Sequence, residues 1–494
     1  MSQLNKDILF LIFEELQDDS KSLFSCLMVN RLWCEIVIPI LWRNPWCYDI
    51  NYSNKSYLFI VIASYLSDDI KKSIAKLGIQ LPSFTHQSLL FDYLSFCRSI
   101  NVYTIRIITF IGSFLAHDQF LLQQEFYYLF MKKFPELKYL DMRSIRHQIF
   151  YFPEASLRFE SLCELKCDTS IDSSYFYGLA QLCQYIQRLI IFNVDPTNLH
   201  GVVKLIEVQK NLKYFEWKDD HSMFDIVHAS GPDQDFYNEV LFALEKNSNN
   251  ITHLNFYFIF IIYSSLKVFP KFYRLKTLMT SFDSYDEEQL KLCTYRDLEI
   301  FKMNNCNLKA ASIIIENSGG HLKKILIEPY ELIEFIDSFS KNSFDFIRNI
   351  HKFCPLIEFL SLIFFPLDMY FAELEKLLKI CHNLKSLLLF SMPYGVLSRK
   401  EILDYGENLL EVLIISTPIN LKELRFCGNF EFSLETLEEF LERWEGSTLS
   451  ILISNDTCEG EDYKKLINKY KDSKVIKDFR RESYENVIDM DFKL

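Results

Sequence analysis

Residues 298–308 read LEIFKMNNCNL, and the spacing of their apolar side chains decides the fold. Leu298, Phe301 and Met303 stand three and then two residues apart, and Cys306 and Leu308 follow them. This spacing fits a short strand whose alternate side chains point inward. If it recurs at a fixed period, the chain is a stack of repeated units, each too small to bury its apolar face alone.

The same spacing recurs along most of the chain. Its thirteen hexapeptides are LKYLDM from Leu137, LCELKC from Leu162, IQRLII from Ile186, LKYFEW from Leu212, ITHLNF from Ile251, LKTLMT from Leu275, LEIFKM from Leu298, LKKILI from Leu322, IEFLSL from Ile357, LKSLLL from Leu384, LEVLII from Leu410, LKELRF from Leu421 and LSILIS from Leu449. Nine of the twelve intervals between starts lie between 23 and 28 residues, and the others are 39, 35 and 11. Random matches to this spacing would not recur at such a regular interval. We expect loop insertions at the two long intervals, whereas 11 residues are too few to hold a helix.

The stretch from Leu298 to Leu308 matches L-x-x-L-x-L-x-x-[NC]-x-L, so the array resembles the leucine-rich repeats. The resemblance implies a strand and a return segment in each repeat, stacked into a curved horseshoe with one continuous core. Several return segments have helical spacing, notably residues 369–381 and residues 433–446, where Ser433 is a candidate N-cap.

Residues 1–46 carry three apolar stripes at helical spacing, with short breaks at residues 17–21 and at Pro39. Three helices of this size cannot bury all that apolar surface among themselves, so a partner or the following domain must cover some of it. The segment resembles the F-box, whose pattern runs L-P-x-E-[IL]-L-x-x-I-F-x-x-L and continues to Arg-x-Trp and Leu-Trp. The matching residues are Leu4, Ile8, Leu9, Ile12, Phe13, Leu16, Val29, Arg31, Trp33, Leu41 and Trp42. The usual Pro and Glu are replaced here by Asn5 and by Lys6 or Asp7.

An F-box followed by leucine-rich repeats resembles the substrate receptors of cullin-RING (SCF-type) ubiquitin ligases. The resemblance implies that the F-box docks a small adaptor protein, that the repeats hold a protein substrate, and that the chain itself is not an enzyme and needs no cofactor. The adaptor-binding residues it implies, forming or supporting the adaptor surface, are Leu4, Ile8, Leu9, Ile12, Phe13, Leu16, Val29 and Trp33. Two alternatives remain: residues 1–46 are a helical cap of the array, or the protein is a leucine-rich interaction scaffold without ligase recruitment.

The expected fold class is α/β: a leucine-rich repeat solenoid preceded by a small all-helical F-box-like module. We place the module at residues 1–46, a helical and irregular connector with the solenoid cap at residues 47–130, and the repeat array at residues 131–494.

Residues between the apolar positions of each strand alternate onto the opposite, concave face. In the early units this face is charged and aromatic, with Tyr139, Asp141, Arg143, Glu164, Lys166, Asp168, Tyr214, Glu216 and Lys218. In the later units it is apolar, and we expect it to bind the substrate through Phe359, Ile363, Leu388, Phe390, Val412 and Ile414. An apolar face of this kind is either a binding surface or is covered by a terminal segment. The tail from Glu459 onward is a candidate cover, although a final capping unit is the simpler interpretation of it.

Composition excludes several other classes of protein. The net charge of −13 and the isoelectric point near 5.4 argue against a nucleic-acid partner, which needs clustered basic residues. An odd number of cysteines, thirteen, and a first segment without a basic, cleavable leader favour the cytoplasm or nucleus. The longest apolar run, residues 256–263, is far short of the roughly 20 residues that cross a bilayer, so we expect no membrane among the partners of this chain.

No nucleotide-binding, hydrolase or metalloprotease motif occurs in the sequence. His351, Cys354, Cys381 and His382 have the side chains of a tetrahedral zinc site. Cys354 and Cys381 each stand three residues before a repeat start, however, where a small buried side chain fits. We therefore expect no metal.

Overall fold

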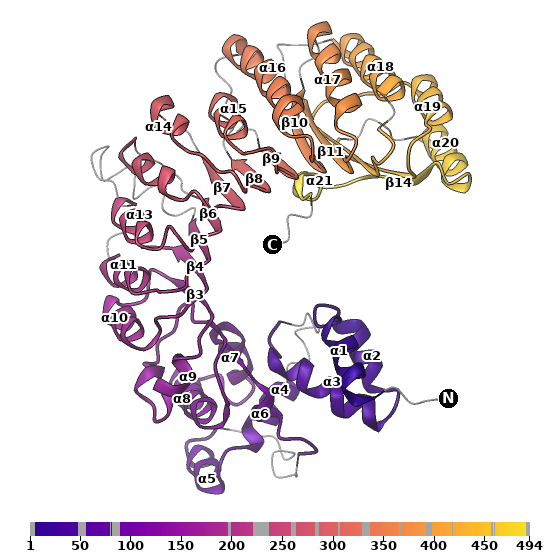
Figure 1. The fold of residues 1–494 in the computed structure, drawn as a ribbon. Helices are drawn as coiled ribbons and strands as arrows, with labels where there is room; N and C mark the ends of the chain where they lie inside the picture. The colour runs from indigo at the N-terminus through magenta and orange to yellow at the C-terminus, as the bar shows by residue number, and fades with distance from the viewer. Residues whose placement is uncertain are drawn as a thin grey trace. The chain divides into compact units, whose positions relative to one another are not determined.

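The computed structural model describes residues 5–47, 56–79, 81, 89–195, 199–220, 237–257, 263–281, 286–304, 307–328, 336–364, 367–391, 398–416, 418–455, 458 and 460–490. The chain divides into two compact units, residues 1–247 and residues 248–494 (Figure 1). In each unit parallel strands alternate with helices, and each strand neighbours the next one along the chain.

The first unit opens with helices and continues as an alternating array. Its helices before the sheet are α1 (Lys6–Glu14), α2 (Ser20–Leu27), α3 (Arg31–Arg43), α4 (Ser56–Ser64), α5 (Asp68–Lys76) and α6 (Tyr93–Phe96). Its strands are β1 (Ser99–Asn101), β2 (Tyr139–Asp141), β3 (Glu164–Asp168), β4 (Arg188–Asn193) and β5 (Tyr214–Asp219). Its other helices are α7 (Val102–Thr109), α8 (Ala116–Lys133), the 3₁₀ turn η3 (Ile149–Tyr151), α9 (Ala155–Phe159), α10 (Ser173–Leu182), α11 (His200–Glu207) and α13 (Asn238–Glu245).

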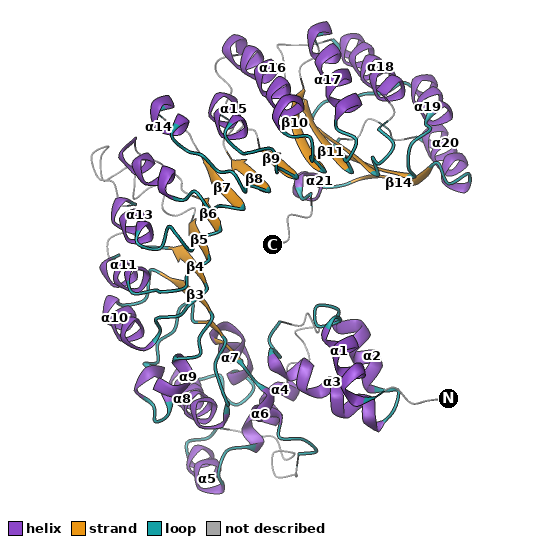
Figure 2. Ribbon diagram, in the orientation of Figure 1, coloured by secondary structure: helices purple, strands orange, loops and turns teal. Residues whose placement is uncertain are grey.

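The second unit repeats the alternation. Its strands are β6 (His253–Tyr257), β7 (Thr277–Ser281), β8 (Ile300–Asn304), β9 (Lys324–Ile327), β10 (Phe359–Phe364), β11 (Ser386–Ser391), β12 (Glu423–Cys427), β13 (Leu449–Ile453) and β14 (Ile476–Arg481). Its helices are the 3₁₀ segment η4 (Tyr263–Lys271), α14 (Glu287–Lys291), α15 (Leu308–Glu316), α16 (Ile336–Phe353), α17 (Asp368–Ile380), α18 (Arg399–Ser416), α19 (Leu434–Arg443), α20 (Glu461–Asp472) and α21 (Tyr484–Ile488). Helices α15 to α20 lie on one side of the strands, and α21 lies on the other side (Figure 2).

The hexapeptide LEIFKM shows why the strands form where they do. The side chains of Leu298, Phe301 and Met303 are completely buried. In the parallel register Phe301 stands beside Leu278 of β7 and Ile325 of β9. Equivalent apolar positions of successive units therefore form continuous layers between the strands and the helices, and each layer removes apolar surface from water. The predicted α/β class, with strands and helices alternating in an open parallel sheet, is confirmed.

Twelve of the thirteen hexapeptides contain a strand, and LEVLII is the exception. Leu410 and the residues after it belong to α18, so the prediction of a strand there is wrong. The L-x-x-L spacing also fits a helix, and Leu409, Leu410 and Leu413 are buried on one face of α18. The short interval of 11 residues already conflicted with a separate unit. Assignment of the array to the leucine-rich repeat family stays a prediction.

Two strands were not expected from the sequence. β1 lies inside the predicted connector, residues 47–130, and pairs with β2, so the parallel ladder starts before residue 131. β14 pairs with β13 near the C-terminal end. β1 has only three residues, too few for any periodicity to show.

The predicted return helices are confirmed. α17 covers residues 369–380, and α19 begins after Ser433, whose hydroxyl accepts a hydrogen bond from the backbone N–H of Thr436 at 3.1 Å. α20 contains the helical stripe of the C-terminal tail, and its buried Leu466 and Ile467 belong to a final helix and strand unit with β14. The capping-unit interpretation of that part of the tail is therefore correct.

Helices α1 to α3 correspond to the three N-terminal stripes. Phe13 of α1 packs edge-on against the Trp33 ring of α3, with ring centroids 4.9 Å apart. Pro39 does not break α3, contrary to our expectation, because buried residues on both sides of it keep the helix packed.

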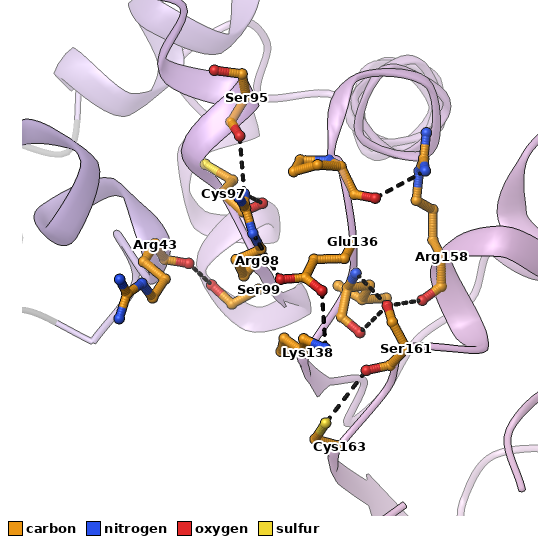
Figure 3. Close-up of polar contacts among 12 residues, drawn as sticks. Arg43, Ser95, Cys97, Arg98, Ser99, Glu136, Lys138, Arg158, Ser161 and Cys163 are labelled. Carbon is orange, nitrogen blue, oxygen red and sulfur yellow. Dashed lines mark hydrogen bonds and ion pairs between the residues drawn. The ribbon is translucent and has the colours of Figure 1, made fainter. Parts of the chain in front are cut away.

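These helices are anchored to the first strand. The Trp46 indole donates to the Ser99 carbonyl at 2.9 Å, and the Arg98 backbone N–H donates to the Arg43 carbonyl at 2.9 Å. Figure 3 shows this junction, where Arg98 also pairs with Glu136. These hydrogen bonds fix the end of α3 and the residues that follow it against β1.

Candidate protein-interaction surfaces

The N-terminal helices expose aliphatic side chains that the fold does not bury. Ile8, Leu11 and Ile12 share one face of α1 and are 47%, 63% and 45% exposed. Met28 and Val29, directly after α2, are 87% and 55% exposed. We call these five residues the N-terminal apolar set. Large aliphatic groups that remain exposed at helical spacing are typical of a surface that another helix or domain covers.

The structure divides the predicted adaptor-binding residues into three groups. Ile8, Ile12 and Val29 are exposed, whereas Leu16 and Trp33 are half-buried. Leu9 and Phe13 are only 3% and 2% exposed, so of the two roles we expected, to form or to support the adaptor surface, they fit the supporting role.

Leu4 lies outside the described residues. Leu11 and Met28 are exposed and were missed by the motif. Helical spacing from Ile8 would have indicated Leu11.

The strand face of the first unit, on the side away from the interior layers, is polar. In the register, Tyr139, Glu164, Arg188 and Tyr214 form one row across the strands, and Asp141, Lys166, Ile190 and Glu216 form the next. Asp168, Phe192 and Lys218 form a third row. We call these eleven residues, with Arg143 beside them, the polar strand face. The prediction that early units show a charged and aromatic face is confirmed.

Side chains on the polar strand face hold one another in place through ion pairs and cation–π contacts. The Arg188 guanidinium lies 3.6 Å from the centre of the Tyr214 ring and 3.7 Å from the Glu164 carboxylate. Arg143 pairs with Asp141 at 2.6 Å and lies 4.6 Å from the Phe192 ring centre. The hydrogen bonds that the Arg143 guanidinium donates to the Asp141 carboxylate raise the pKa of Arg143 above its usual value. Four acidic and four basic residues thus balance in charge, which suits a partner with its own mixed charges and not a polyanion.

The corresponding face of the second unit is buried at three of the positions where we expected substrate contacts. Ile363, Leu388 and Phe390 are at most 2% exposed, so the prediction that they form an accessible substrate surface is wrong. Of the four predicted substrate-binding residues that lie on strands, Phe359 is the one that stays half-buried. The Lys324 ammonium lies 4.7 Å from its ring centre.

Val412 and Ile414 do not lie on the strand face at all, because they belong to α18. Val412 is 8% exposed and Ile414 is half-buried. Their assignment to the substrate surface is wrong for the same reason that LEVLII is not a strand.

A terminal segment packs on this strand face at β12. α21 packs on β12, and the Arg425 guanidinium donates from Nη1 to the carbonyls of Asn486 at 3.1 Å, Val487 at 2.9 Å and Asp489 at 2.5 Å. Arg425 stands beside Leu388 in the register, so the segment lies on the same face as the buried apolar residues. Residues 484–490 thus cover this face at β12, whereas α20, which carries the helical stripe that we considered as a cover, packs with β14.

The candidate zinc residues do not converge. In the described part of the chain, no group of three or more His, Cys, Asp or Glu side chains is arranged to hold a metal ion. Burial raises the pKa of the Cys381 thiol to about 12 and raises that of Cys354 as well, so both remain protonated. His351 lies instead 3.4 Å from the Glu373 carboxylate.

Comparison of the chain with protein-family models and with curated proteins gives no match. Among the residues that the structure describes, no helix has both the length and the apolar character needed to span a membrane. The surfaces therefore carry the functional argument on their own.

Proposed function

We propose that this protein is a non-catalytic substrate-recognition subunit of a cullin-RING (SCF-type) ubiquitin ligase. In this proposal helices α1 and α2 act as an F-box and dock the adaptor, and the leucine-rich array binds a protein substrate in the cytoplasm or nucleus. The observation that carries the proposal is the N-terminal apolar set. Its exposed aliphatic groups stand on the helices that resemble the F-box.

The N-terminal apolar set offers five side chains that a partner could bury. Burial of an aliphatic side chain contributes about 1.5–3 kcal/mol, and a few such anchors usually dominate an interface. Leu9 and Phe13 hold the exposed residues in place from below, because α1 is fixed on α3 through the Phe13 and Trp33 rings. The adaptor surface is thus preorganised in the free chain, which reduces the conformational entropy lost on binding.

Under this proposal the substrate binds on the polar strand face, and not on the later units as the sequence suggested. Tyr139 is 42% exposed there, and Lys166 and Arg188 are half-buried and oriented by Glu164. Aromatic and arginine side chains that are held in place are favourable contact residues at protein interfaces.

Ile12→Asp tests the adaptor surface. The substitution places a carboxylate on an exposed position, so the chain folds, but the charge would be buried without a partner in the complex. We expect a tagged full-length variant to lose the adaptor in co-purification. Leu157→Asp is the matched control, because Leu157 is a 60% exposed leucine of helix α9, outside the N-terminal helices, and this variant should retain the adaptor. Retention of the adaptor by the Ile12→Asp chain would contradict the proposal.

The second candidate function is a leucine-rich interaction scaffold that recruits no ligase. It is favoured by the anchoring of α1 to α3 on β1, since a terminal cap of a repeat array needs only that role. The two functions differ in one observable: a scaffold retains no adaptor even when the full-length chain is well folded.

A further inference from the structure

Arg425 recognises the backbone of the C-terminal segment and not its side chains. All three carbonyls that its Nη1 contacts belong to the last turn of α21 or follow it directly. Carbonyls at a helix C-terminus have no partner within the helix, and a cation is the favoured group to satisfy them. Nη2 pairs with Glu423 at 2.9 Å, which fixes the guanidinium on β12. Its Nε is buried and has no hydrogen-bond partner among the residues that the structure describes.

Two aliphatic side chains of the segment are also buried. Val487 and Met490 stand three residues apart and are 0% and 1% exposed. The neighbouring Tyr484, Glu485 and Asn486 are exposed. Two buried aliphatic side chains and a set of carbonyls therefore take part in the contact of the segment with the strand face.

Such a short element is not stable by itself. α21 has five residues, and isolated helices shorter than about 12–15 residues are marginal in water. Only residues 482 and 483 join it to β14. The contact with Arg425 is thus what orders the segment, and its short tether gives it a high effective concentration at the face.

We infer that the strand face around Arg425 is a peptide-binding surface that residues 483–490 occupy in cis, and that a protein partner displaces them. The partner presents the C-terminal turn of a helix, with free carbonyls and two aliphatic side chains three residues apart. This inference goes beyond the proposed function, since it adds a second binding surface, on β12 of the second unit, to the polar strand face of the first. Residues 483–490 occupy the surface until such a partner competes with them.

An exchange experiment tests this surface. A protease site is inserted between Arg481 and Glu482 of the full chain, the chain is cut, and the released fragment is dialysed away. A fluorescent peptide ESYENVIDM, residues 482–490, is then titrated and followed by anisotropy. The cut chain should bind it saturably, and the uncut chain should bind at least about tenfold more weakly, because the tethered segment competes.

Two variants show which chemistry holds the peptide. Arg425→Met in the cut chain should weaken binding by about tenfold or more, because hydrogen bonds to a charged donor are lost. Arg443→Met is the matched control, because Arg443 lies on α19 and pairs with Glu411 and Glu439. It should leave the affinity unchanged. A peptide with Asp in place of Val487 and Met490 should not bind.

Saturable binding that is equal in cut and uncut chains, or no binding by a cut chain with unchanged circular dichroism, would overturn the inference. If the cut chain does not stay folded, hydrogen exchange on the unmodified chain decides. The amides of Val487 and Asp489, which donate to the Ser483 and Glu485 carbonyls, should exchange by local opening, faster than those of β12. Exchange only together with β12 would show that the segment is a fixed part of the fold. None of these readouts involves the adaptor, so failure of the ligase proposal would leave them unaffected.

Discussion

Phe390→Ala should destabilise the second unit strongly, whereas Phe359→Ala should not. Phe390 is 2% exposed and stands beside Ile363 and Cys427 in the register. Truncation of a fully buried phenylalanine costs about 3–5 kcal/mol, because the lost burial and the cavity add. Phe359 is half-buried, and its loss removes part of an apolar contact and the interaction with the Lys324 ammonium, about 1–2 kcal/mol together.

Pulse proteolysis across a urea series measures the free energy of unfolding of each variant, with fragment identity reporting on the second unit. Phe242→Ala on α13 is the control, since a 53% exposed ring in the first unit should change stability by less than about 0.5 kcal/mol. A Phe390→Ala cost below about 1 kcal/mol, or equal costs at Phe359 and Phe390, would refute the reasoning that the strand face of the second unit is buried at Phe390.

Two further predictions concern the packing of the second unit. Gly406→Ala should lower the melting temperature, because a Cβ at this position of α18 would lie 2.0 Å from the Glu431 carbonyl oxygen. Overpacking of this kind costs about 1–3 kcal/mol. An unchanged unfolding transition in calorimetry would contradict the close approach of these two segments. The hydrogen bond from Lys323 to Glu299, 2.7 Å long, lowers the pKa of Glu299 below its usual value of 4.5. The stabilising contribution of this pair is therefore present above that pH and is lost as the pH falls through the lowered pKa. Glu299→Gln should therefore destabilise the chain by less than about 1 kcal/mol at pH 7 and by nothing at strongly acidic pH, and urea denaturation at the two pH values checks this.

The periodic part of the fold is predictable from the sequence because each unit repeats the same physical requirement. Leu298, Phe301 and Met303 must be buried by the neighbouring units, and the same need recurs at each start. The prediction failed at LEVLII, where a helix satisfies the same spacing, and at β1, which is too short to show a period. Local spacing does not distinguish these cases, since only the neighbouring units decide between them.

The candidate surfaces were harder to predict because exposure depends on distant residues. Nothing near Leu388 or Phe390 in the sequence indicates that Arg425 binds a segment 61 to 64 residues further along the chain. The polar strand face was predictable, because alternation in β3 and β5 assigns Lys166 and Glu216 to it without any long-range information. In α1 the spacing predicted the helix, but burial alone separated Leu9 and Phe13 from Ile8 and Ile12.

Hydrogen exchange with and without the adaptor tests the central proposal most directly. The full-length chain is labelled alone and with excess adaptor, and exchange is compared peptide by peptide. If the N-terminal apolar set docks the adaptor, slower exchange is confined to α1, α2 and residues 28–29, and β1 to β14 are unchanged. Slower exchange in the strands without any change in α1 and α2, or no change anywhere in a folded chain, would contradict the assignment of this protein as a ligase substrate receptor.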